Sequence, residues 1–172
     1  MRYLSAITML ILTLAIMQPV AAQSFKPDID VGAKAYAEKD YATALKHFLP
    51  LTKKGHAEAQ SVLGNMYRKG QVGIVNYDLA LFWYREAAKQ GDPYSLYNLG
   101  VMYRDGQGVV QDLVMAYVSH NVAVAKGNNF YSWVRKRDEV HAKLTAPERR
   151  LALKLSKLCY KKPAKCPEYR DD

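Results

Sequence analysis

The side chains that could carry out acid–base, nucleophilic or metal chemistry do not fall into a catalytic arrangement in this chain. No metal-ligand spacing such as H-E-x-x-H joins its four histidines, which are His47, His56, His120 and His141. No serine after residue 22 has a lysine three positions later, as the S-x-x-K motif of serine acyl enzymes requires. No glycine loop matches a phosphate-binding pattern. The sequence therefore predicts no enzyme, and neither a metal nor a cofactor.

The two cysteines, Cys159 and Cys166, do have a spacing that indicates a bond. Six residues separate them, so they lack the C-x-x-C spacing of redox motifs. An even number of cysteines at short separation is typical of a local disulfide in an exported protein. We predict a structural disulfide, and a reactive thiol pair is the alternative.

Small and polar residues recur along the chain at a fixed step of 36 positions. The series are Gly55, Gly91 and Gly127; Ala44, Ala80 and Ala116; and Asp40, Asn76 and Asp112. A period of this length is typical of stacked helical hairpins, in which each unit buries its apolar face on the next. The sequence therefore predicts an all-α, right-handed α-solenoid.

Apolar residues within each unit have helical spacing. From Ala59 to Tyr67 they follow i, i+3, i+4, i+7 and i+8, and residues 80–88 repeat the pattern. The next unit predicts helices around 93–103 and 113–126, and a shorter hairpin over 31–54 precedes both.

After Gly127 the period fails. Thr145-Ala146-Pro147-Glu148 has the pattern of a capping box and predicts a final helix. Leu151, Leu155 and Leu158 form the apolar side of that helix, and basic residues lie mostly elsewhere. A basic terminal helix fits the polar cap that a solenoid needs.

These motifs resemble the Sel1-like repeat, a relative of the tetratricopeptide repeat. The resemblance lies in Ala57-Glu58-Ala59-Gln60, in Leu63-Gly64-Asn65-Met66-Tyr67, in residues 80–88 and in the loop 106–112. Ser119 and His120 depart from the aromatic pair of the preceding unit, Trp83 and Tyr84. We interpret His120 as a packing residue, and a pH-sensitive contact is the alternative.

The start of the chain, the repeats and the cysteine pair together predict six segments. We expect a secretory signal peptide over 1–22, an N-terminal partial repeat over 23–54 and two Sel1-like repeats over 55–90 and 91–126. C-terminal capping helices over 127–160 and a disulfide-closed tail over 161–172 follow. The family implies an α-solenoid used for protein–protein contacts. Its cysteine-rich members have been linked to β-lactam hydrolysis, but they look like repeats with a disulfide in every hairpin. Here the single cysteine pair lies outside the repeats, so a β-lactamase-like enzyme is the least favoured alternative.

In a superhelix of this type the first helix of each hairpin lines the concave face. Aromatic and arginine side chains, frequent interface anchors, occur at groove positions there. The predicted partner-binding groove consists of Glu58, Ser61, Arg68, Tyr94, Tyr97, Val101, Arg104, Trp133 and Arg137. We hypothesise that its tyrosines and arginines hold an acidic-aromatic segment of a partner. The alternative is that the final helix covers Phe130 and Trp133.

The first 22 residues have the pattern of a secretory signal. Arg2 precedes an apolar run from Leu4 to Met17, and small residues up to Ala22 offer a cleavage site. The run is shorter than the roughly 20 residues that span a bilayer. We therefore expect cleavage near Ala22, a periplasmic or secreted protein, and no integral membrane segment after cleavage.

Charge is distributed unevenly along the chain. Removing the signal lowers the net charge from +9 to +8, of which residues 127–172 contribute +6. This end either contacts an anionic envelope surface or only aids solubility. Nucleic acid is not an expected partner of an exported protein. We expect an interaction module or adaptor of the cell envelope, with an immunity protein that neutralises a secreted toxin as the alternative.

Overall fold

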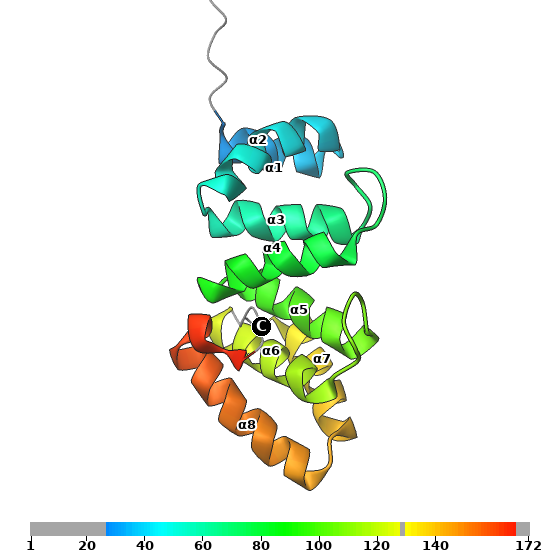
Figure 1. Cartoon of the computed structure of the whole chain (residues 1–172), viewed down its shortest axis with the longest axis vertical. Helices are drawn as coiled ribbons and strands as arrows, with labels where there is room; N and C mark the ends of the chain where they lie inside the picture. The colour runs from blue at the N-terminus through cyan, green and yellow to red at the C-terminus, as the bar shows by residue number, and fades with distance from the viewer. Residues whose placement is uncertain (1–26, 128–129, 168–172) are drawn as a thin grey trace, which may run out of the picture.

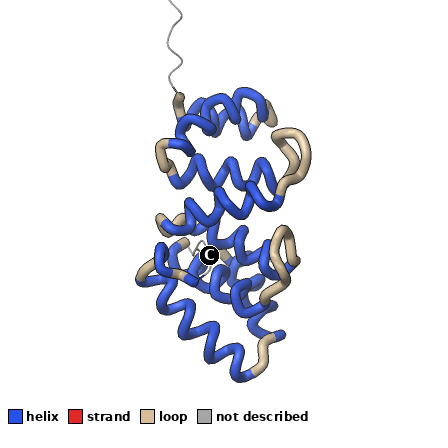
Figure 2. Tube along the Cα trace, in the orientation of Figure 1, coloured by secondary structure: helices blue, strands red, loops and turns tan. Residues whose placement is uncertain are grey.

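The computed structural model describes residues 27–127 and 130–167, and in these it contains eight α-helices, one 3-10 helix and no strand (Figure 1; Figure 2). The elements are α1 (Ile29–Ala37), α2 (Tyr41–Lys53), α3 (Ala57–Arg68), α4 (Tyr77–Lys89), α5 (Pro93–Asp105), α6 (Leu113–Lys126), α7 (Tyr131–Lys143), α8 (Ala146–Lys161) and η1 (Pro163–Lys165). The signal peptide predicted over 1–22 lies outside the described residues, as does the tail from residue 168 onward.

Side-chain caps explain where the repeated helices begin. Asp40, Asn76 and Asp112 each accept a hydrogen bond from the backbone N–H three residues later, and they cap α2, α4 and α6. Satisfying these free N–H groups favours a helix start at that residue. One of the 36-residue series is thus the series of N-caps.

The hairpins stack into an elongated solenoid (Figure 1). Helices α1 and α2, α3 and α4, and α5 and α6 pack as pairs, and each pair contacts the next. Helices α7 and α8 both pack on α6, where the 36-residue step ends. The predicted all-α solenoid is confirmed.

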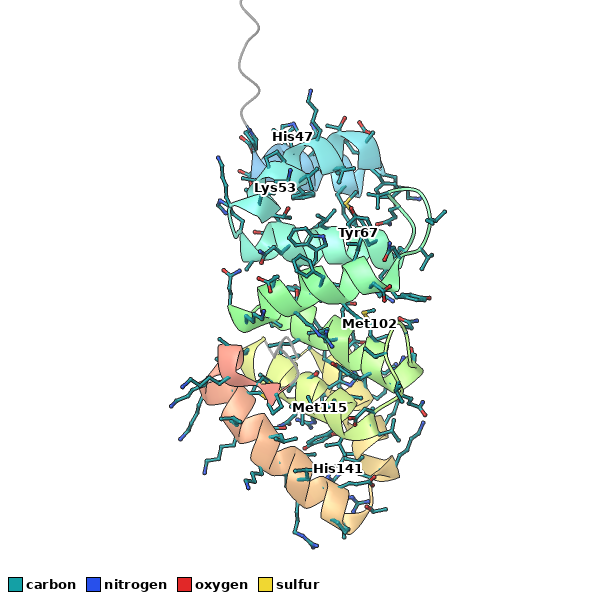
Figure 3. The ribbon with its side chains drawn as sticks, viewed as in Figure 1. His47, Lys53, Tyr67, Met102, Met115 and His141 are labelled. Carbon is teal, nitrogen blue, oxygen red and sulfur yellow. A yellow bond between two sulfur atoms is a disulfide. The ribbon has the colours of Figure 1, made fainter. Side chains whose placement is uncertain are left out.

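The core follows the stack in two clusters of buried residues. One cluster, around Phe48 and Leu63, joins the first hairpin to α3, and the other, around Leu99 and Val122, runs to the C-terminal helices. Tyr67, labelled in Figure 3, packs against both. The alanines of the 36-residue series, Ala44, Ala80 and Ala116, are fully buried, which lets the paired helices approach closely.

The predicted apolar side of α8 is only partly its buried side. Ala152, Ser156 and Cys159 face the protein and Leu155 packs against the core, whereas Leu151 and Leu158 are exposed. The small side chains allow α8 to lie close to α6, and larger leucines at the contact would hold the two helices apart.

The predicted disulfide is present. Cys159 and Cys166 are joined, with their Cα atoms 4.7 Å apart, and both are buried. The bond holds η1 beside α8, and η1 also contacts α4, two helical hairpins earlier in the stack. The tail therefore ties the C-terminal cap to the middle of the solenoid.

Candidate partner-binding groove

A groove of about 500 Å³ lies between the first helices of two neighbouring repeats, α3 and α5. We call it the α3–α5 groove, and its lining is Glu58, Ser61, Val62, Asn65, Asp92, Pro93, Tyr94 and Asn98. Because α3 and α5 are equivalent helices one repeat apart, the groove opens along the row of first helices. An extended peptide segment is a chain of the size and shape to occupy such a groove.

The lining carries two carboxylates and no lysine or arginine. Glu58 is exposed in the first turn of α3, and Asp92 caps α5 by accepting a hydrogen bond of 2.7 Å from the backbone N–H of Ser95. The lining therefore carries two formal negative charges, although the whole chain has a net charge of +9.

Tyr94 forms the aromatic wall of the groove and is held in place from behind. Its ring is 54% exposed and lies edge-on to Trp133, with centroids 5.2 Å apart and planes at 90°. Phe130 contacts both rings, at 6.2 Å from Tyr94 and 4.8 Å from Trp133. Such packing fixes the orientation of Tyr94, so its ring is ordered before a partner arrives.

Trp133, predicted to line the groove, instead belongs to the core. It is 7% exposed and stacks on Tyr97, with centroids 4.8 Å apart and an interplanar angle of 14°. The alternative that α8 covers Trp133 and Phe130 does not hold, because Trp133 is buried against α5 and Phe130 is still 40% exposed. Trp133 supports the groove from within the protein.

The other predicted groove residues divide between two places. Glu58, Ser61 and Tyr94 line the α3–α5 groove, although Ser61 is buried. Tyr97, Val101 and Arg104 lie farther along α5 and Arg137 on α7, all half-buried and outside the lining. Arg68 lies at the end of α3, near the buried hydroxyl of Tyr84, which donates to Asn65 Oδ1 at 3.5 Å. Burial of that hydroxyl outweighs the nearby positive charge of Arg68 and raises the pKa of Tyr84 to about 12.

The two arginines expected to attract an acidic partner already have carboxylate partners. Arg104 contacts Asp105 through two hydrogen bonds of 2.7 Å, and Arg137 contacts Asp138 at 2.8 Å. The hydrogen bonds between Arg104 and Asp105 raise the pKa of the guanidinium and lower that of the carboxyl. Their charges are therefore largely balanced within the protein.

Comparison with known proteins assigns the fold to a family. The Sel1 repeat family matches residues 57–92 and 93–117. The structure of a protective antigen present in uropathogenic Escherichia coli strains, which displays an SLR fold, is 28% identical with a TM-score of 0.73. This chain contains Sel1 repeats over residues 57–117.

The matched proteins are longer than the aligned part. The alignment covers 82% of this Sel1-like repeat protein but 30% of the E. coli antigen. A Sel1 repeat protein from Oxalobacter formigenes is 24% identical with a TM-score of 0.55, over 67% of this chain and 55% of that one. No curated protein matches the chain. The shared part is the repeat fold, which is typical of protein-interaction modules that bind along a concave surface.

The groove predicted from the sequence contains three of the eight lining residues, and the most important ones missing are Asp92 and Asn98. Asp92-Pro93 is a recognisable helix start, so the position of Asp92 could have been predicted. Its neighbour across the groove, Glu58, lies 34 residues earlier, and only the packing of α3 beside α5 brings the two carboxylates to one site.

His120 of the Sel1-like repeat protein is a packing residue. Its ring is fully buried and stacks on Tyr97, with centroids 5.1 Å apart. Burial, together with the nearby positive charge of Arg104, lowers the pKa of His120 to about 4. The alternative of a surface contact that titrates near neutral pH does not hold for a buried, neutral imidazole.

The remaining histidines do not form a metal site in the part of the chain that the structure describes. His47 lies on α2 and His141 on α7, near opposite ends of the stack (Figure 3). Residues 27–127 and 130–167 contain no group of three or more His, Cys, Asp or Glu side chains that could hold a metal ion. Within the same residues, every helix is too short or too polar to cross a membrane.

Proposed function

We propose that this Sel1-like repeat protein is an exported interaction module of the cell envelope, and that its α3–α5 groove binds an extended basic segment of a protein partner. The observation that carries the proposal is a carboxylate-lined groove on a chain of opposite net charge. A basic side chain entering the groove would find Glu58 and Asp92 near the ring of Tyr94. A cation over a tyrosine face beside carboxylates is favoured by both charge and ring electrostatics.

The basic partner replaces the acidic-aromatic segment expected from the sequence. Arg104 and Arg137 already pair with neighbouring carboxylates, so an acidic segment would have to compete with Asp105 and Asp138. The groove itself offers such a segment no cation. Placement of the module in the periplasm or outside the cell rests on the signal-like pattern of residues 1–22.

Peptide selection on the immobilised protein, without residues 1–22, tests the chemistry of the groove before the natural partner is known. We expect the selected peptides to carry lysine or arginine next to an apolar residue. Glu58→Gln combined with Asp92→Asn should weaken their binding roughly tenfold, since two charge contacts are lost. Asparagine keeps the N-cap acceptor at position 92, so α5 should stay folded.

The matched control removes the same charge from another helix. Asp78→Asn combined with Glu86→Gln changes two carboxylates on α4, outside the α3–α5 groove, and should leave peptide affinity unchanged. Selection of acidic peptides, or equal loss in both double variants, would show that the proposed groove chemistry is wrong. Once a partner is identified, its stoichiometry separates an adaptor with several partners from an inhibitor that forms one tight one-to-one complex.

A further inference from the structure

The outer half of α8 carries more exposed apolar area than a solenoid cap requires. Four large apolar side chains on this helix are exposed, namely Leu151 at 48%, Leu153 at 52%, Leu158 at 39% and Tyr160 at 48%. A terminal repeat normally turns a polar face outward, because no further repeat covers it. The leucines therefore require an explanation other than the stacking of repeats.

Basic side chains occupy the same outward half. With Ala152, Ser156 and Cys159 facing the protein, the 100° step of an α-helix places Arg150, Lys154, Lys157 and Lys161 on the opposite side. All four are exposed. Leu151 and Leu158 border this basic row on one flank, and Leu153 and Tyr160 border it on the other.

This face keeps a positive net charge when the rest of the chain is counted. Residues 146–167 contain seven lysines or arginines and one acid, Glu148, and residues 168–172 add one arginine and three acids. The carboxylate of Glu148 is already used, because it accepts hydrogen bonds of 2.7 Å from the backbone N–H and the hydroxyl of Thr145. The disulfide between Cys159 and Cys166 also keeps Lys162 and Lys165 next to the end of the helix.

We infer that α8 is a membrane-surface contact, which lies on the anionic headgroups of a lipid bilayer with its leucines entering the interface. Interfacial helices usually carry lysine and arginine on one face and leucine or aromatic residues on the other, and bind such surfaces through both charge and apolar burial. In α8 the protein covers the face opposite the basic row, so the apolar side chains left for the interface are those that border the row. A second copy of the chain is a poor occupant, since two α8 helices would bring five lysines or arginines against five. A soluble polyanion would pair with the basic side chains of α8 but would leave its leucines exposed to water.

Vesicle co-sedimentation of the mature protein tests this inference. Vesicles of phosphatidylglycerol mixed with phosphatidylcholine should bind at least tenfold more tightly than vesicles of phosphatidylcholine alone, and 0.5 M salt should weaken the binding. Lys154→Gln combined with Lys157→Gln should reduce affinity for the anionic vesicles roughly tenfold. Leu151→Gln combined with Leu158→Gln should also reduce it, which a purely ionic contact would not show.

Lys53→Gln combined with Lys54→Gln is the matched control. It removes the same charge at the end of α2, near the opposite end of the stack, where Lys53 is labelled in Figure 3. This variant should bind anionic vesicles as the wild type does, and all variants should melt at similar temperatures. The groove variant with Glu58→Gln and Asp92→Asn should also bind vesicles normally, which separates this inference from the proposed function.

Equal binding to both kinds of vesicle, or an equal loss in the α2 control, would overturn the inference. A concentration-dependent dimer abolished by Leu151→Gln and Leu158→Gln, without vesicle binding, would assign the face to a second copy. Retention by an acidic protein with no affinity for anionic vesicles would likewise assign it to that protein and contradict the lipid contact.

Discussion

The imidazole of His120 occupies the space that a side chain at position 100 would need. A Cβ atom added to Gly100 would lie 2.6 Å from His120 Nε2, well inside van der Waals contact. The preceding repeat has the same relationship between Gly64 and Tyr84, where an added Cβ would lie 2.8 Å from Tyr84 Cδ1. A glycine in the first helix of each repeat thus receives a ring from the second helix, and this contact sets how closely the pair packs.

Gly100→Ala should therefore destabilise the protein. We expect a loss of about 1–3 kcal/mol in the free energy of unfolding, because the added methyl group meets a buried ring that has no space to move into. The measurement is urea unfolding followed by circular dichroism. In a His120→Ala background the ring is gone, and the same substitution should instead stabilise by up to about 1 kcal/mol through helix propensity. An unchanged cost in that background would show that the ring contact is not the cause.

The buried His120 should make stability depend on pH in a defined window. Its pKa is about 4 in the folded protein and 6.5 as the ordinary value. Below pH 6.5 the unfolded chain binds a proton that the folded protein does not, so stability falls as pH decreases from about 6.5 to 4 and is unaffected above that range. This linkage predicts a loss of about 2 kcal/mol between pH 7 and pH 5.

The comparison variant for the pH effect is His120→Tyr. Tyrosine is the residue at the equivalent position of the preceding repeat, Tyr84. A tyrosine side chain does not change charge between pH 4 and pH 6.5. Urea unfolding at pH 7 and pH 5 should show a smaller loss for the variant than for the wild type. The same slope in both proteins would assign the pH dependence to other groups, such as the nearby Asp105.

Removing the disulfide should weaken the C-terminal cap. Cys159→Ser combined with Cys166→Ser should cost about 2–3 kcal/mol in the chain-entropy estimate, since six residues lie inside the closed ring. Hydrogen exchange should then rise in η1 and in the end of α8, which the bond holds together. Both cysteines are buried, so the native protein should resist thiol labelling. Rapid labelling without reductant would contradict the bond.

Substituting Trp133 should mainly lower stability, whereas substituting Tyr94 should mainly weaken peptide binding. Trp133→Ala should cost about 3–5 kcal/mol of stability, because it empties a buried position stacked on Tyr97. Tyr94→Ala should cost about 1 kcal/mol and weaken peptide binding tenfold or more, as expected of an exposed aromatic anchor. Thermal melts and peptide titrations on both variants check this division. Normal peptide affinity of a folded Tyr94→Ala protein would remove Tyr94 from the binding surface.

Local chemistry made the repeat predictable. The 36-residue series of Ala44 follows helix pairing, and the series of Asp40 follows helix capping, so each signal is present in a few neighbouring residues. The series of Gly55 ends differently. Gly55 and Gly91 have positive φ values of 84° and 88°, whereas at Gly127 an added Cβ would lie 2.9 Å from the ring of Trp133. Glycines at the same spacing are therefore needed for a positive φ in two repeats and for close packing in the third.

Tertiary packing decided what the sequence did not reveal. Glu58 and Asp92 line one groove because two helices from different repeats lie side by side, which no local pattern indicates. The apolar side predicted for α8 held only at Leu155, because leucines are usually buried and here the close approach to α6 favours Ala152 and Ser156. Trp133 was predicted to line the groove because it lies 36 residues after Tyr97. The repeat does not continue after Gly127, and Trp133 is buried in the core instead.

In-cell photocrosslinking tests the central claim about the α3–α5 groove most directly. A photoreactive phenylalanine analogue is placed at position 94, in the groove, or at position 82 on α4, where Phe82 is 51% exposed. We predict a discrete crosslinked partner from position 94 that disappears when Glu58→Gln and Asp92→Asn are added, and none from position 82. Crosslinks from position 82 alone, or crosslinks from position 94 that survive both neutralising substitutions, would contradict a basic segment bound in this groove.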